Sequence, residues 1–263
     1  MSALAMTVAK FQARDVVRSR WLVAYVAFFW IVGEGLLRFT SGDARAILSL
    51  ANLVLYVVPL VTLVFGTVYF YSAREFTELL LAQPVDRRAL FLGLYAGLTA
   101  PLCLGVVLGV GTPFAIRGGA GAATAVLASL LGTAVALTLA FAAIAFCIAL
   151  AFADRLRGLG TAIGVWMLCA IVYDGLVMAT VAAFDGHPLE RPMLALMLAN
   201  PIDLARVMLL LQLDISALMG YTGAVFQQWL GGGAGLIAIA CALLVWIAAP
   251  AWLGLRAFST KDF

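Results

Sequence analysis

Residues 122–152 read AATAVLASLLGTAVALTLAFAAIAFCIALAF, an apolar stretch without a charged side chain. A helix needs about 20 apolar residues to cross the hydrocarbon core of a bilayer, and this stretch is longer. The whole chain has the same character: of its 263 residues, 65% are hydrophobic and 11% are charged. Soluble domains have roughly 45–50% apolar and 25% charged residues. The sequence therefore indicates a membrane protein, and it excludes a cytosolic enzyme and a nucleic-acid-binding module.

Five further stretches are long and apolar enough to be membrane spans. We therefore predict an all-α polytopic protein that forms one membrane domain over residues 1–263. The six predicted transmembrane helices cover residues 21–37, 47–71, 89–116, 122–152, 159–184 and 232–255.

The distribution of Lys and Arg predicts the orientation of these helices. Cytoplasmic loops of membrane proteins carry an excess of basic residues. With the N-terminus inside, the predicted inner segments hold eleven Lys and Arg and the outer segments hold five. Both termini are therefore expected in the cytoplasm, as an even number of spans requires.

Besides short loops, three informative segments lie outside the predicted spans. Residues 1–20 are expected to form a basic amphipathic helix on the inner membrane face. Its apolar residues are Phe11, Val16, Val17 and Trp21, and its charged residues are Lys10, Arg14, Asp15 and Arg18. Residues 72–88 form an inner loop, and residues 185–231 form a long outer segment with a short helix.

The chain shows no motif for catalysis, for a cofactor or for a metal. It has no G-x-x-x-x-G-K-[ST] sequence, so it lacks a P-loop. Its one histidine, His187, is predicted in an outer loop, where a solvated residue is favoured over a metal ligand. The four cysteines lie in apolar stretches without a C-x-x-C pair, which favours small buried hydrophobic residues over zinc ligands.

Two acidic residues fall inside predicted spans, where ionisable groups are candidates for function. Glu34 precedes Arg38 by four residues, the favourable spacing for an ion pair on a helix. Asp174 lies in the outer half of the fifth span. It can line a substrate cavity or bind a neighbouring helix. An intramembrane enzyme would require one of these two acids for turnover, and no paired acidic motif supports that alternative.

The third predicted span carries a stripe of glycines at four-residue spacing. Gly93, Gly97, Gly105 and Gly109 fall on one helix face, with Pro101 in the gap, and Gly160 and Gly164 repeat the spacing in the fifth span. Small residues on one stripe let helix backbones approach closely. Packing within the bundle is favoured over a dimer interface.

The inner loop contains a short predicted helix. Phe76, Leu79 and Leu80 fall at i, i+3 and i+4, which forms one apolar face. Pro84 ends the helix. This pattern predicts either docking to a soluble partner or a position in the inner membrane interface.

Residues 74–88, REFTELLLAQPVDRR, resemble the signature of type-2 ABC exporter permeases. The resemblance implies that this helix couples the membrane domain to a separate ATPase subunit, which binds ATP and magnesium. The residues implied to dock the ATPase are Arg74, Glu75, Phe76, Glu78, Leu79 and Arg87. It also implies a permease homodimer in a bacterial inner membrane, because ATP is held between two ATPase subunits in this family.

Two further stretches, residues 160–166 (GTAIGVW) with Tyr173 and Asp174, and residues 200–206 (NPIDLAR), resemble the NosY-type branch of the family. That resemblance implies either substrate export or work on a periplasmic accessory protein during nitrous oxide reductase maturation.

Residues 200–206 also predict a helix without any resemblance. Asn200 is a good N-cap, Pro201 suits the first helical position and Asp203 suits the first turn. The helix is expected to continue through Arg206 to about Met219, to end at Gly220 and to lie in the outer interface beneath an extracytoplasmic partner.

The alternative for the whole chain is a structural or quinone-associated membrane subunit of a respiratory complex.

Overall fold

The computed structural model describes residues 3–40, 43–116, 122–183, 196–212 and 233–261. Every regular element within these described ranges is helical. In chain order the elements are α1 (Ala3–Arg18), α2 (Arg20–Phe39), α3 (Asp43–Ser72), α4 (Arg74–Leu81), α5 (Arg87–Ile116), α6 (Ala122–Ala151), α7 (Arg155–Met167), the π-helical turn η1 (Leu168–Val172), α8 (Tyr173–Ala183), α10 (Pro201–Gln212) and α12 (Gly233–Thr260).

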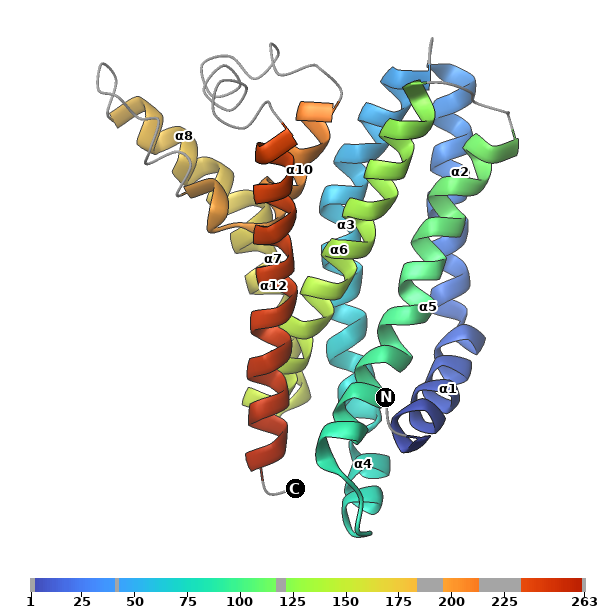
Figure 1. The fold of residues 1–263 in the computed structure, drawn as a ribbon, viewed down its shortest axis with the longest axis vertical. Coiled ribbons are helices and arrows are strands. Elements are labelled where there is room, and N and C mark those ends of the chain that lie inside the picture. Colours follow the sequence, from blue (N-terminus) through green and yellow to red (C-terminus); the bar gives the residue numbers. More distant parts are fainter. Residues whose placement is uncertain (1–2, 41–42, 117–121, 184–195, 213–232, 262–263) are drawn as a thin grey trace.

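Six helical segments in the described residues are long and apolar enough to cross a membrane, which confirms the predicted all-α fold. They are Arg20–Phe39, Arg45–Ser72, Arg87–Ile116, Thr124–Ala151, Arg155–Ala183 and Gly235–Thr260. Figure 1 shows α4 and both ends of the chain at the same end of the bundle. We call this the terminal end, and the other the distal end.

Helices α5 and α6 form the centre of the bundle. Helix α5 packs against α1, α2 and α6, and α6 also packs against α3, α10 and α12. A cluster of aromatic rings fills the core near the terminal end, where Phe146 contacts Phe70 at 5.0 Å and Phe91 at 5.8 Å between ring centroids. Edge-to-face contacts of this kind stabilise a core beyond the burial of apolar area.

The glycine stripe of α5 packs within the chain, as predicted. A Cβ atom at Gly97 would lie 2.6 Å from the Cβ of Gln12 in α1, and one at Gly109 would lie 2.9 Å from the Cβ of Phe29 in α2. The missing side chains therefore let both helices approach α5 closely. Gly160 and Gly164 differ, because no described atom lies within 4 Å of either Cβ position.

The predicted N-terminal helix is present, and one of its faces packs on the bundle. Ala5, Val8, Gln12 and Val16 are buried against the bundle, whereas Phe11, Val17 and Trp21 are exposed. The physical reason is the room that Gly93 and Gly97 leave on α5. The Oε1 of the buried Gln12 accepts a hydrogen bond from the hydroxyl of Tyr69 at 3.0 Å, so this buried oxygen has a partner.

The fifth span is not a regular α-helix. Its middle is the π-helical turn η1, and Figure 1 shows α8 beyond it, directed away from the other helices. None of the described residues of α8 is buried. Single π-helical turns inside α-helices occur frequently at functional sites.

Helix α10 is packed within the bundle over the residues that the structure describes. It spans Pro201–Gln212, and the expected end near Met219 lies outside the described residues, as do most of residues 185–231. Ile202, Leu204 and Ala205 are fully buried, and α10 packs against α6, α12, α3 and η1. The expectation of a helix lying in the outer interface was wrong, because its apolar side chains are covered by neighbouring helices.

Candidate functional site

Helix α4 begins one residue after α3 ends. Ala73 separates the two helices, and the buried Thr77 donates its hydroxyl hydrogen to the carbonyl of Ala73 at 2.7 Å. The backbone N–H of Ala82 bonds to the carbonyl of Glu78, and Pro84 follows, where a helix cannot continue. The sequence therefore places a short, separate helix at the terminal end of the bundle.

The predicted docking residues of α4 do not all face outward. Glu75 and Glu78 are exposed, and Leu79 has 71% of its surface exposed. Leu80 is only partly exposed and packs against the core. Arg74 and Glu78 form an ion pair at 3.0 Å, between Nε and Oε1. Leu79 is therefore the exposed apolar side chain of α4.

Phe76 is half-buried, because it meets an aromatic ring of α1. Its ring stacks on Phe11, with the ring centroids 5.9 Å apart and the planes inclined by 21°. Phe76 was predicted to dock the ATPase subunit, and its contact with the N-terminal helix was not predicted. Helices α1 and α4 therefore present one joined surface at the terminal end.

Arg87, the last of the predicted docking residues, contacts the end of α12 instead. Its Nη1 donates to the carbonyls of Ser259 at 3.2 Å and Lys261 at 2.8 Å. Lys261 donates in turn to the carbonyl of Leu150 at the end of α6. Burial lowers the pKa of Lys261, and the nearby charge of Arg74 lowers it further. These bonds fasten the ends of α12 and α6 to the start of α5.

Glu34 and Arg38 form the ion pair that their spacing indicates. The Nε of Arg38 lies 2.8 Å from Oε1 of Glu34, and the Arg38 side chain is 65% exposed. A pair this exposed contributes little to stability.

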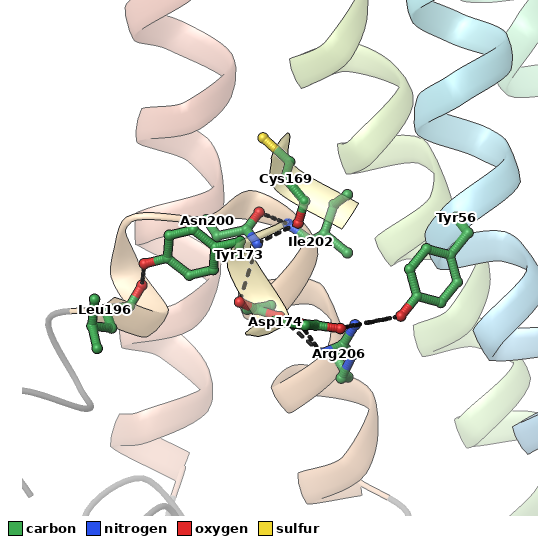
Figure 2. A network of polar contacts seen from close by, with 9 residues as sticks. Tyr56, Cys169, Tyr173, Asp174, Leu196, Asn200, Ile202 and Arg206 are labelled. Carbon is green, nitrogen blue, oxygen red and sulfur yellow. Dashed lines mark hydrogen bonds and ion pairs between the residues drawn. The ribbon is translucent and has the colours of Figure 1, made fainter. Parts of the chain in front are cut away.

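A polar network lies between α3, α8 and α10 (Figure 2). At its centre, Nη1 of Arg206 is 2.9 Å from Oδ1 of Asp174 and 2.9 Å from Oδ1 of Asp203. Nη2 of Arg206 donates to Oδ2 of Asp174 at 3.1 Å and to the hydroxyl of Tyr56 at 3.0 Å. That hydroxyl lies 3.3 Å from Oδ2 of Asp174 and donates to it. Asp174 therefore binds a neighbouring element, one of the two roles that the sequence left open.

Asn200 extends this network to the π-helical turn. Its Oδ1 accepts from the backbone N–H of Ile202 at 3.1 Å, which is the predicted N-cap. Its Nδ2 donates to the carbonyl of Cys169 at 2.8 Å and to Oδ2 of Asp203 at 3.1 Å. The residue is 1% exposed, and these three hydrogen bonds use both its side-chain oxygen and its side-chain nitrogen. Pro201, the first residue of α10, lies beside it and is also buried.

The sequence analysis placed these residues in two separate groups. It assigned Asp174 to a span, and Asn200, Asp203 and Arg206 to an outer helix, and the structure brings the groups together. Tyr56 was missed. The only signal for it was a tyrosine within an apolar span, which is also common in ordinary packing.

The described residues contain no group of three or more His, Cys, Asp or Glu side chains placed to hold a metal ion. His187 lies outside the described residues. The network is instead arranged to hold an arginine between two carboxylates, which links three helices in a largely apolar setting.

Comparison of the sequence with known proteins identifies the family and two relatives. A sequence model described as "ABC-2 family transporter protein" matches residues 48–263. The chain is 27% identical to a probable ABC transporter permease protein NosY of Pseudomonas aeruginosa, over 81% of this chain and 84% of that protein. It is also 27% identical to the protein of that name from Stutzerimonas stutzeri, over 94% of this chain and 92% of that protein.

The family match favours a transporter subunit over the alternative of a respiratory-complex subunit. Together with the six apolar helices, it indicates a multi-pass protein of the bacterial inner membrane. A permease of this kind implies an ABC ATPase as a partner. The chain therefore belongs to the ABC-2 family of transporter proteins and is a permease subunit of an ABC transporter.

Proposed function

We propose that the permease receives mechanical work from a separate ATPase through α4, on the cytoplasmic side. The supporting observation is the exposed Leu79, flanked by exposed Glu75, on a short helix that lies beyond the spans. An apolar side chain surrounded by charge on a projecting helix suits insertion into a groove of a soluble partner. ATP and magnesium bind the partner, and this chain has no catalytic role.

Two copies of the permease act together in this proposal. One bundle has one α4, and two ATPase subunits enclose ATP in this family. A homodimer therefore supplies the second docking helix. Helix α4 follows α3 after a single residue, and α3 carries Tyr56, which contacts Arg206. A displacement of α4 therefore has a continuous route through α3 to the polar network.

The output of this motion is either export of a substrate or work on a periplasmic accessory protein. The resemblance of residues 160–166 and 200–206 to NosY-type permeases supports the second output, in the maturation of nitrous oxide reductase. A strain lacking the permease would then produce nitrous oxide reductase with its copper absorption bands lost, and the wild-type gene would restore them. Unchanged bands in that strain would contradict this part of the proposal.

The coupling itself is tested with a matched pair of variants in the co-expressed permease and ATPase. Leu79→Asp places a charge on the proposed dock. Phe39→Asp places the same charge on a side chain that is 92% exposed at the distal end. We expect Leu79→Asp to reduce ATPase co-purification and ATP turnover at least ten-fold, and Phe39→Asp to leave both near wild type. Normal co-purification with Leu79→Asp, or an equal loss with Phe39→Asp, would overturn the proposal.

A further inference from the structure

A groove of about 780 Å³ opens between α2, α3 and α7. It lies apart from α4, and its end at Val57 adjoins Tyr56, the α3 residue of the polar network. Its wall is almost entirely apolar and includes Trp21, Phe28, Phe65, Ile163 and Trp166. The indole N–H of Trp166 donates to the carbonyl of Tyr56 at 3.0 Å. This bond links α7 to α3 at the end of the groove that lies beside Val57.

One face of α3 forms the floor of the groove and is only half covered by protein. The half-buried residues recur at i, i+3, i+4, i+7, i+8 and i+11, which is a continuous helical stripe. They are Val57, Leu60, Val61, Val64, Phe65 and Val68. The remaining faces of α3 are packed against the bundle, so this stripe is the part of α3 left for another apolar group.

The length of the groove matches one leaflet of a bilayer. Eleven residues separate Val57 from Val68, which corresponds to about 16 Å at 1.5 Å per residue. The hydrocarbon core is about 30 Å thick, so one leaflet contributes about 15 Å. Val57 lies near the middle of the span Arg45–Ser72 and Val68 lies four residues from its end, so the groove follows the terminal half of that span.

The mouth of the groove has the polar groups of a membrane interface. Arg155 lines the groove, is exposed, and has no ion pair among the residues that the structure describes. Trp21 lies at the same end, as tryptophan does at the level of the lipid headgroups. Its chain neighbour Arg20 is also exposed. Basic pockets between transmembrane helices on the cytoplasmic side bind anionic lipid headgroups.

We propose that this groove binds one anionic phospholipid, with the headgroup phosphate on Arg155 and an acyl chain along the α3 stripe. The charge at the mouth favours this occupant over a second copy of the chain. A helix from a second copy would cover Arg155, and burying a cation without a partner is costly. A phospholipid supplies both the apolar chain and the anion.

The test uses native mass spectrometry of the purified transporter after exposure to dioleoylphosphatidylglycerol or to zwitterionic dioleoylphosphatidylcholine in mild detergent. We expect the wild type to retain one phosphatidylglycerol per permease chain and to release phosphatidylcholine. Arg155→Gln should weaken retention of phosphatidylglycerol about five-fold, the factor for losing one arginine contact with an anionic lipid surface. Arg157→Gln is the matched control, because Arg157 does not line the groove. Its side chain is highly exposed, and its Nε lies 3.7 Å from Oδ2 of Asp154.

A second variant separates the acyl chain from the headgroup. Ile163→Trp fills the groove and leaves Arg155 in place, so both lipids should be released. If that variant is not monodisperse in detergent, the comparison of Arg155→Gln with Arg157→Gln decides the question. Equal retention of both lipids by the wild type, or an equal loss in the two arginine variants, would overturn the proposal. A disulfide between two chains carrying Val64→Cys, formed in the membrane, would assign the groove to a second copy and overturn it as well.

Discussion

Phe11 of α1 and Phe76 of α4 stack face to face across the terminal end of the bundle, with ring centroids 5.9 Å apart. The two residues are 65 positions apart in the chain, and each belongs to a helix outside the six spans. Helix α1 is itself fixed to α5, where Ala5, Val8 and Gln12 are buried. The stack therefore braces α4 against a helix that is anchored to the centre of the bundle.

We predict that Phe11→Ala loosens α1 and α4 together. A stacked aromatic pair is worth about 0.5–1.5 kcal/mol beyond its buried area, and this pair is partly exposed, so the lower half of that range is expected. Tryptic cleavage after Lys10 and Arg14 should become roughly two-fold to five-fold faster than in the wild type. Met6→Ala is the control, because Met6 is exposed on the same helix. An unchanged cleavage rate in Phe11→Ala would show that the stack does not hold α1.

Gly97 provides a sharper test of how α1 is held. A methyl group at Gly97 would lie 2.6 Å from the Cβ of Gln12 and 3.2 Å from the carbonyl oxygen of Ala9. Gly97→Ala should therefore displace α1 at a cost of about 1–3 kcal/mol, which is typical of overpacking. The thermal midpoint should fall and cleavage of α1 should rise.

The matched control for this change is Gly132→Ala in α6, where no described atom lies within 4 Å of the Cβ position. An alanine in a helix interior is favoured over glycine by about 1 kcal/mol, so this variant should be as stable as the wild type or more stable. If Gly97→Ala is also neutral, then α1 does not pack on α5 in the membrane as the structure shows.

Replacing Arg206 should lower the thermal midpoint more than replacing either of its acidic partners. Removing the guanidinium leaves two carboxylates facing each other. Deleting one partner of a fully buried ion pair costs about 3–5 kcal/mol. The cost here should be lower, because 23% of the Arg206 side chain and 35% of the Asp174 side chain are exposed to solvent, which screens the charges. Asp174→Asn should cost less, because Arg206 keeps Asp203 at 2.9 Å. Tyr56→Phe removes one hydrogen bond and should cost about 0.5–1.5 kcal/mol. The order of thermal midpoints should be Tyr56→Phe, then Asp174→Asn, then Arg206→Ala as the lowest.

Arg38→Ala serves as the control for this series, since it removes an arginine from an exposed pair that is worth about 0–1 kcal/mol. Equal midpoints for Arg206→Ala and Arg38→Ala would mean that the network is hydrated and carries little energy.

The features of this structure that depend on residues close in sequence could be predicted. Hydropathy alone located the six spans, since each needs only a long apolar run. The short helix of residues 74–81 followed from its apolar spacing and from Pro84, and the cap at Asn200 followed from the residue types of its first turn. Each of these features depends on neighbours within one or two helical turns.

Contacts between distant segments were not predictable, for a physical reason. A transmembrane helix that is apolar on every side gives no pattern to show which face meets protein and which meets lipid. The sequence therefore could not show that Tyr56 faces Arg206, 150 residues further along the chain. It also could not show that α1 buries Gln12 and leaves Phe11 free to stack on Phe76, because that choice depends on the room beside Gly97.

Asn200 should control access to the π-helical turn, and Cys169 reports on it. Asn200→Ala removes the cap of α10 and leaves the carbonyl of Cys169 without its bond at 2.8 Å. Losing such a cap costs about 0.5–2 kcal/mol, so α10 and η1 should separate more often, and maleimide labelling of Cys169 should become several-fold faster. The measurement uses a Cys241→Ser background, because Cys241 is the exposed cysteine, and follows the labelled peptide by mass spectrometry.

Asn200→Asp keeps the capping oxygen but loses the donor to Cys169, so faster labelling in both variants would assign the effect to the Cys169 bond. Faster labelling in Asn200→Ala alone would assign it to the cap. Asn52→Ala, at an exposed position on α3, should label at the wild-type rate. Wild-type labelling rates in both Asn200 variants would contradict the link between α10 and the fifth span.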